Sequence, residues 1–144
     1  GPACYNKGQD SACITDANLV LGRLNPDYFL GGEHKLYPEL AEQAIARLAS
    51  QLGLTSVETA RGIIEIANAN MVGAIRLISV QRGFDPREFV LVAFGGAGPL
   101  HANALARELR TTITQIAATR PAPRTRTANR TIATSTVASA RNAK

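Results

Sequence analysis

The stretch FVLVAFGGAGPLH, residues 89–101, decides the fold. Its first six residues are apolar and rich in strand formers, which predicts a strand buried on both faces, as in a sheet covered by helices. A glycine-rich turn follows at once over 95–98, and residues 102–109 then read as a helix. A strand, a glycine-rich turn and a helix in this order are typical of an α/β layer.

The glycine-rich turn has two properties that suit a binding site. Glycines let a ligand approach the backbone closely, and the start of a helix offers unpaired N–H groups and a partial positive charge. This combination suits a phosphate or the polar edge of a nucleotide, although a tight turn alone would also need glycines. The spacing matches neither the P-loop nor the dinucleotide fingerprint. We interpret His101 as a helix-start or packing residue in preference to a base or a metal ligand.

Three helices are expected before the strand. The first covers 16–23, with Thr15 or Asp16 as its cap. The second covers 38–52, because a proline suits its first position and a glycine follows its apolar stripe. The third starts after a sequence with capping-box spacing at 55–58 and continues to Gln81.

The net charge of +5 is unevenly distributed. Residues 1–110 hold ten Lys+Arg and all eleven Asp+Glu, which gives −1, whereas 111–144 hold six Lys+Arg and no acid, which gives +6. The segment 111–144 also lacks Leu, Gly and aromatic residues, so we expect it to be disordered. A basic tail could contact nucleic acid, but it has no aromatic residues for stacking and the body is nearly neutral.

Composition excludes several classes of protein. Two cysteines, Cys4 and Cys13, cannot form a disulfide scaffold or complete a tetrahedral zinc site. We find no apolar run approaching the roughly 18–20 residues of a membrane span and no secretory signal, so we expect no membrane segment and a cytoplasmic location.

Five blocks of sequence carry a family resemblance. In chain order they are GPACY (1–5), TDANLVLGRL (15–24), NPDYFLGG (25–32), IANANM (66–71) and VAFGGAGPLHA (92–102). Together they resemble the hydantoinase A / 5-oxoprolinase family. Within the fourth block, Asn68 and Asn70 lie on different faces of the expected helix, so at most one would face a site and helix packing explains the pair better.

The resemblance implies an actin-like ATPase fold, as in sugar kinases and heat-shock ATPases. It also implies ATP-dependent opening of cyclic amides such as hydantoin and 5-oxoproline, through phosphorylation of the amide oxygen with Mg²⁺; relatives in this family carboxylate ketones. The residues that we expect to bind the nucleotide are Gly95, Gly96, Ala97, Gly98, His101, Asp16 and Asn18. For Asp16, capping of a helix is the competing interpretation. The resemblance assigns no catalytic residue and no metal ligand.

Members of the family are several times longer than 144 residues. We therefore expect 1–110 to be a C-terminal fragment of the ATPase domain that lacks its N-terminal lobe and a hydantoinase B-type subunit, and that is inactive alone. The alternatives are a non-catalytic structural fragment and a basic module that binds anions or nucleic acid. The residues after 110 do not match the family pattern, and their composition suggests a natural tail or a shifted reading frame.

Overall fold

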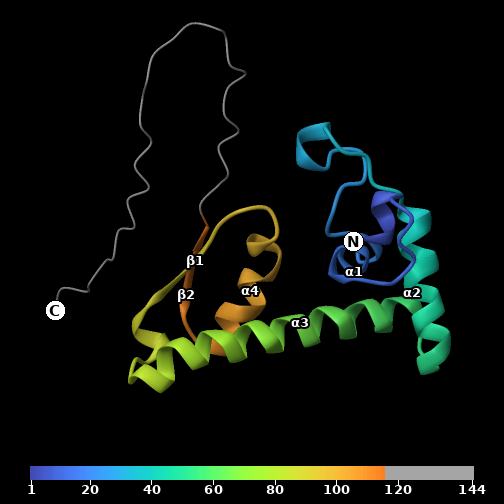
Figure 1. Ribbon diagram of the computed structural model, residues 1–144. Helices are drawn as coiled ribbons and strands as arrows, with labels where there is room; N and C mark the ends of the chain where they lie inside the picture. Colours follow the sequence, from blue (N-terminus) through green and yellow to red (C-terminus); the bar gives the residue numbers. More distant parts are fainter. Residues whose placement is uncertain (116–144) are drawn as a thin grey trace, which may run out of the picture.

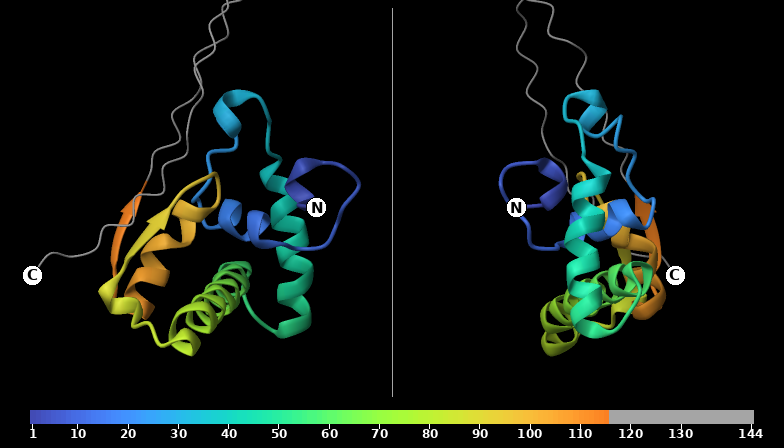
Figure 2. Two further views of the ribbon diagram at one scale, coloured as in Figure 1. Left: turned by 60° about the vertical axis from the view of Figure 1, so that its left-hand side comes forward. Right: turned by 90° about the vertical axis from the view of Figure 1, so that its right-hand side faces the viewer.

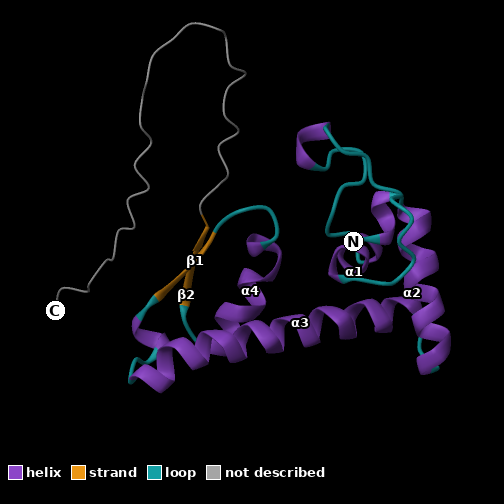
Figure 3. Cartoon of the chain, viewed as in Figure 1, coloured by secondary structure: helices purple, strands orange, loops and turns teal. Residues whose placement is uncertain are grey.

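The computed structural model describes residues 1–115 and shows a helix-rich α/β arrangement. Its elements are α1 (Ile14–Val20), α2 (Pro38–Leu52), α3 (Ser56–Ser79), β1 (Val90–Ala93), α4 (Gly98–Leu109) and β2 (Thr112–Gln115), joined in part by single turns of 3₁₀ helix. Figure 1 shows α3 running along the molecule, with α1 and α2 at one end and the two strands with α4 at the other. Figure 3 shows the same arrangement by element type.

Two helices begin and end where local sequence signals place them. Helix α2 starts at Pro38 and ends before Gly53, whose φ of 67° is the left-handed conformation that favours glycine. Helix α3 begins after the capping box of Thr55 and Glu58. Helix α1 differs, because its N-cap is Cys13 and Asp16 occupies the third helical position, so capping by Thr15 or Asp16 is wrong.

Helix α3 joins two separate packing clusters. At 24 residues it is roughly 36 Å long. Its first half packs against α1 and α2 around Ile45 and Ile64, and its second half packs against α4 around Val72 and Leu105. Figure 1 shows these groups toward opposite ends of the helix, and the left view of Figure 2 shows them on its two sides. A third cluster, under the N-terminal segment, centres on Leu36.

Part of the apolar side of α3 has no cover among the described residues. Ile66 and Ile78 are 66% and 62% exposed. Contrary to our expectation that no segment reaches the length of a membrane span, the helical stretch Ser56–Arg82 is long and apolar enough to cross one by length and composition alone. The core helix of a folded domain meets the same criteria when it is mostly buried, whereas 17% of the candidate window is buried here, although both halves of α3 pack against other elements.

The strands and α4 form a βαβ unit. Strand β1 pairs in parallel with β2, in the register that sets Val90 opposite Thr112 and Ala93 opposite Gln115. Strand β2 lies in the segment for which we expected disorder. Thr and Ile at 112–114 are strand formers, and the neighbouring strand supplies their backbone partners. The rest of the predicted tail, 116–144, lies outside the described residues.

The burial expected for β1 is wrong. Its side chains alternate between faces, as those of any strand do. Ala93 is buried and Leu91 is half-buried on the side of α4, but Val90, Val92 and Phe94 are 52%, 43% and 71% exposed. Helices cover one face of the strand, and within residues 1–115 no element covers the other.

Candidate functional site

The glycine-rich turn lies between the carboxyl end of β1 and the start of α4. In parallel α/β units, ligands bind at this end of the strands. Gly95 has a φ of 80°, which only glycine adopts without strain, and it reverses the chain after Phe94. All four residues from Gly95 to Gly98 are exposed, and a Cβ built on Gly95, Gly96 or Gly98 would meet no atom within 4 Å. The backbone of the turn is therefore open to a ligand.

The turn also carries a row of free donors. Within the described part of the chain, the backbone N–H groups of Gly95, Gly96, Ala97 and Gly98 have no hydrogen-bond acceptor. Gly98 is the first residue of the twelve-residue helix α4, which no side chain of residues 1–115 caps. It supplies the only free N–H of the helix start up to Leu100, because Pro99 has no N–H and the N–H of Leu100 donates to the Ala97 carbonyl at 3.1 Å. Free N–H groups at a helix start favour an anion, because the helix dipole adds positive potential there. The geometry fits the phosphate contact expected for these four residues, which stays a prediction.

His101 is the fourth residue of α4 and is buried. The residue is 3% exposed, and its Nδ1 lies 2.7 Å from Oδ1 of Asn68 on α3. Burial lowers the pKa of His101, and the positive charge of Arg23 lowers it further, so the ring is neutral at pH 7. Its burial agrees with the packing role that we preferred for His101, and its contact with a nucleotide stays a prediction. Of the two asparagines of α3, Asn68 bonds to His101 whereas Asn70 is exposed, so helix packing does not account for both.

Arg23 brings a cation to this region. It follows α1 and Gly22, and its side chain is exposed. Its positive charge lowers the pKa of His101, after the larger effect of burial. Neither of the two ion pairs found within residues 1–115 uses Arg23. The guanidinium is thus available to an anion at this end of the molecule.

Asp16 and Asn18 are placed elsewhere, inside the N-terminal cluster. The Asp16 carboxylate is fully buried and accepts the backbone N–H groups of Ala3, Cys4 and Cys13 at 3.1, 2.8 and 3.1 Å. Asn18 is 2% exposed and donates to the carbonyl of Ile14. The structure gives Asp16 the role of fastening the N-terminal segment to α1, and nothing brings it into contact with the glycine-rich turn.

The two cysteines belong to the same cluster. Burial raises the pKa of the Cys4 thiol to about 12, and the neighbouring Asp16 carboxylate adds to the effect. Burial likewise raises the pKa of Cys13. Both thiols are therefore protonated at neutral pH and poor nucleophiles. The structure thus agrees with assigning no catalytic role to Cys4.

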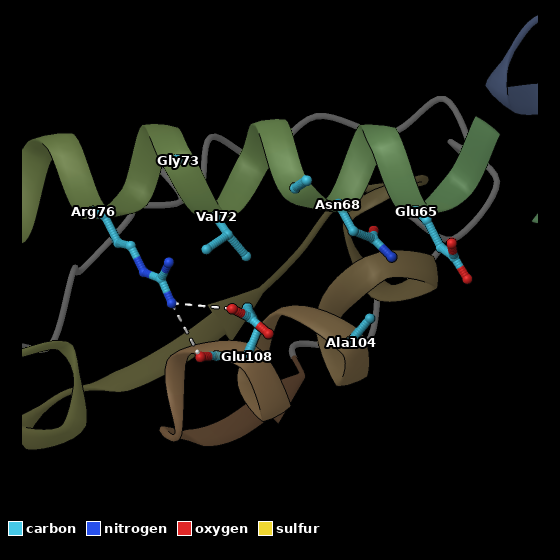
Figure 4. Close-up of a pocket in the computed structure, with 8 residues that line it drawn as sticks. Glu65, Asn68, Val72, Gly73, Arg76, Ala104 and Glu108 are labelled. Carbon is cyan, nitrogen blue, oxygen red and sulfur yellow. Dashed lines mark hydrogen bonds and ion pairs between the residues drawn. The ribbon is translucent and has the colours of Figure 1, made fainter. Parts of the chain in front are cut away.

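A groove of about 460 Å³ runs between α3 and α4. Figure 4 shows Asn68 and Glu65 reaching into it from α3, while Arg76 meets Glu108 of α4 at 3.1 Å between Nη2 and Oε1. Asn68 thus touches both the groove and His101. Sequence reasoning missed the link between Asn68 and His101, because the two residues are 33 positions apart and no local pattern joins them.

Comparisons with known proteins give the family context. The profile of the hydantoinase/oxoprolinase family matches residues 1–122, which extends past the boundary that we set after 110. Caprolactamase subunit alpha of Pseudomonas jessenii is 44% identical over 110 residues, which are 76% of this chain and 16% of that protein.

Two solved structures resemble the chain. The crystal structure of the ATP-dependent caprolactamase from Pseudomonas jessenii matches with a TM-score of 0.72 and 43% identity, over 77% of this chain and 16% of that one. The nucleotide-free structure of acetone carboxylase, from work on ATP-dependent acetone carboxylation, matches with a TM-score of 0.70 and 35% identity, over 76% and 16%. The matched part of the chain therefore spans 16% of the length of each of these relatives.

Proposed function

The chain belongs to the hydantoinase/oxoprolinase family, and from this premise we propose that its Gly95–Gly98 turn binds the phosphates of ATP in an enzyme that opens a small cyclic amide. The observation that carries the proposal is the row of free N–H groups on an exposed turn between β1 and α4. The names of two relatives support it, because both are described as ATP-dependent.

Each part of the turn has a definable task. The N–H groups of Gly95–Gly98 would donate to phosphate oxygens and hold them at the positive end of α4. Arg23 would add a cation at the same end of the molecule. Mg²⁺ stays a prediction from the family resemblance, and residues 1–115 contain no group of three or more His, Cys, Asp or Glu side chains that could hold a metal ion by themselves. No step proposed here depends on that ion.

The chemistry proposed for the complete enzyme is activation of a carbonyl group. The amide oxygen of the ring attacks the γ-phosphorus of ATP, an O–P bond forms, and ADP leaves with the electrons of the broken P–O bond. Water then adds to the activated carbon, and the ring C–N bond breaks as the nitrogen leaves with the electron pair of that bond and takes up a proton, which gives an acyl phosphate. A second water molecule hydrolyses the acyl phosphate to the carboxylic acid and phosphate. The relatives named for caprolactam and for acetone both act on carbonyl compounds, so the same activation serves a hydrolase or a carboxylase.

We favour the cyclic amide over the ketone because the family description and the caprolactamase relative both name cyclic-amide enzymes. A second polypeptide belongs to the proposal as well, because relatives are named as subunits of larger enzymes. In the proposed enzyme this chain supplies one wall of the nucleotide site, and the remaining length of the family protein supplies the other.

The test is an NMR titration of the ¹⁵N-labelled chain with ATP. We expect the amide signals of Gly95, Gly96 and Gly98 to shift, with a dissociation constant on the order of 1 mM, because one wall of a site binds weakly. Replacing Gly96 with Ala should weaken binding roughly tenfold, about 1.4 kcal/mol, since the new Cβ would stand in the space that the phosphate needs.

The matched control is Gly62→Ala in α3. A Cβ at Gly62 also meets no atom within 4 Å, but Gly62 lies in a helix and has no free N–H group to offer. This variant should bind ATP as the parent does. Absence of shifts at the turn with millimolar ATP, or equal binding by Gly96→Ala, would overturn the assignment.

A further inference from the structure

The hydrogen bond between Asn68 and His101 fixes where the imidazole carries its proton. The Oδ1 atom of the amide can only accept, so the Nδ1 atom of His101, 2.7 Å away, must donate. A neutral imidazole with a proton on Nδ1 has a lone pair on Nε2. The ring is neutral at pH 7 because burial and the charge of Arg23 both disfavour the imidazolium form.

The Nε2 atom is left free. Among the described residues, the hydrogen bond to Asn68 is the one contact of this kind that the imidazole makes. Nε2 keeps a small exposed area although His101 as a whole is 3% exposed, because the fully buried side-chain polar atoms without a partner in that part of the chain are Asn18 Oδ1 and Thr59 Oγ1. The lone pair can therefore accept a hydrogen bond from a ligand or a water molecule.

Apart from Nε2, the groups of the proposed nucleotide site are hydrogen-bond donors. The turn that precedes α4 presents the free N–H groups of Gly95–Gly98, and Arg23 supplies a guanidinium that can only donate. Phosphate oxygens satisfy these donors, but the hydroxyl and amino groups of a nucleotide need acceptors. A neutral imidazole held in a single tautomer supplies one.

We propose that Asn68 is a positioning residue of the nucleotide site, because its amide oxygen holds His101 as the Nδ1–H tautomer and so makes Nε2 a hydrogen-bond acceptor beside a turn of donors. The tautomer follows from the geometry of this chain. Its use in binding ATP rests on the proposed function.

The first experiment measures the tautomer directly. Long-range ¹H–¹⁵N spectra of the labelled chain at pH 7 should show His101 with a protonated Nδ1 and an unprotonated Nε2. The chain contains one other histidine, His34, which serves as an internal reference. Replacing Asn68 with Leu removes the acceptor, so His101 should shift toward the Nε2–H tautomer that predominates in water. An Nε2–H imidazole in the parent chain, or no change in Asn68→Leu, overturns the proposal.

Two further variants separate positioning from packing. Asn68→Asp has nearly the same shape and keeps an acceptor, so it should retain the Nδ1–H tautomer while its negative charge raises the titration midpoint of His101. A residue that only filled space would not move that midpoint, and this variant decides the question even if Asn68→Leu does not fold. Asn70→Leu, at an exposed position two residues along α3, should leave both the tautomer and the midpoint unchanged.

The second experiment repeats the ATP titration with Asn68→Leu. Loss of one oriented acceptor should weaken ATP binding by about 3- to 10-fold relative to the parent chain. Equal affinity would overturn the positioning role. If ATP does not bind the parent chain, the proposed function fails and the role in nucleotide binding fails with it, while the imidazole spectra still decide the tautomer.

Discussion

Asp16 shows how a buried carboxylate can serve structure instead of catalysis. Its two oxygens accept three backbone N–H groups, from Ala3, Cys4 and Cys13. The N-terminal segment has little secondary structure of its own, so these bonds fasten it to α1. Burial alone would raise the pKa of Asp16, but the hydrogen bonds hold it below its ordinary value.

Replacing Asp16 with Asn should destabilise the chain by about 2–3 kcal/mol at pH 7, because the amide NH₂ would face N–H donors that then lack an acceptor. The native pKa of Asp16 lies below the unfolded value of about 3.9. Its stabilising effect is therefore complete above pH 4 and is lost as the pH falls through the native pKa. Urea unfolding of parent and variant at several pH values should show the difference shrinking in acid.

The control for this series is Asp10→Asn. Asp10 lies in the same N-terminal segment, but its side chain is exposed and makes no hydrogen bond within residues 1–115. Its substitution should change the free energy of unfolding by less than about 0.5 kcal/mol. A comparable loss in both variants would mean that general charge, and not the buried hydrogen bonds, stabilises the segment.

Prediction from sequence succeeds at single residues where the signal is local. The left-handed Gly53 and the cap at Thr55 depend on neighbours within one turn, and the structure confirms both. Asp16 was ambiguous because a helix cap and a ligand contact use the same residue type. The pairing of Asn68 with His101 could not be predicted, because it depends on how α3 and α4 pack.

At the scale of elements, the capping box of α3 is open to a direct test. The hydroxyl of Thr55 accepts the Glu58 N–H at 3.2 Å, and the Glu58 carboxylate accepts the Thr55 N–H at 2.9 Å. Thr55→Ala should lower the free energy of unfolding by about 1 kcal/mol. Thr55→Ser keeps the oxygen and should lose little, so thermal unfolding of the two variants separates the cap from other effects. Equal losses would show that the hydroxyl does not cap α3.

The strands were harder to predict than the helices, for a physical reason. The boundaries of a helix depend on short-range sequence signals. The burial of β1 depends instead on which elements cover each of its faces, and β2 forms because β1 lies beside it as a pairing partner. The composition of 111–144 is that of a tail, yet residues 112–115 form a strand once a partner is present. The disorder expected for 116–144 and the shifted reading frame suggested after residue 110 stay predictions.

At the scale of the molecule, the two hydrophobic clusters along α3 are separate and have no residue in common. One cluster packs around Ile45 and Ile64 and the other around Val72 and Leu105. The apolar side of β1 faces outward at Val90 and Val92. The relatives carry most of their length outside the matched region, since this chain covers 16% of them, and we expect that additional length to cover this face.

An uncovered apolar strand face beside open strand edges promotes association between copies of a chain. We therefore expect the isolated 144-residue chain to self-associate at high concentration, as measured by sedimentation velocity. The double substitution Val90→Thr and Val92→Thr should reduce association, because threonine keeps the shape and strand preference of valine while adding a hydroxyl.

The control pair is Val57→Thr and Val80→Thr, two valines that are 46% and 54% exposed at the two ends of α3. If both pairs reduce association equally, general surface hydrophobicity is responsible. A selective effect of the β1 pair identifies this face as the one that needs the rest of the family protein.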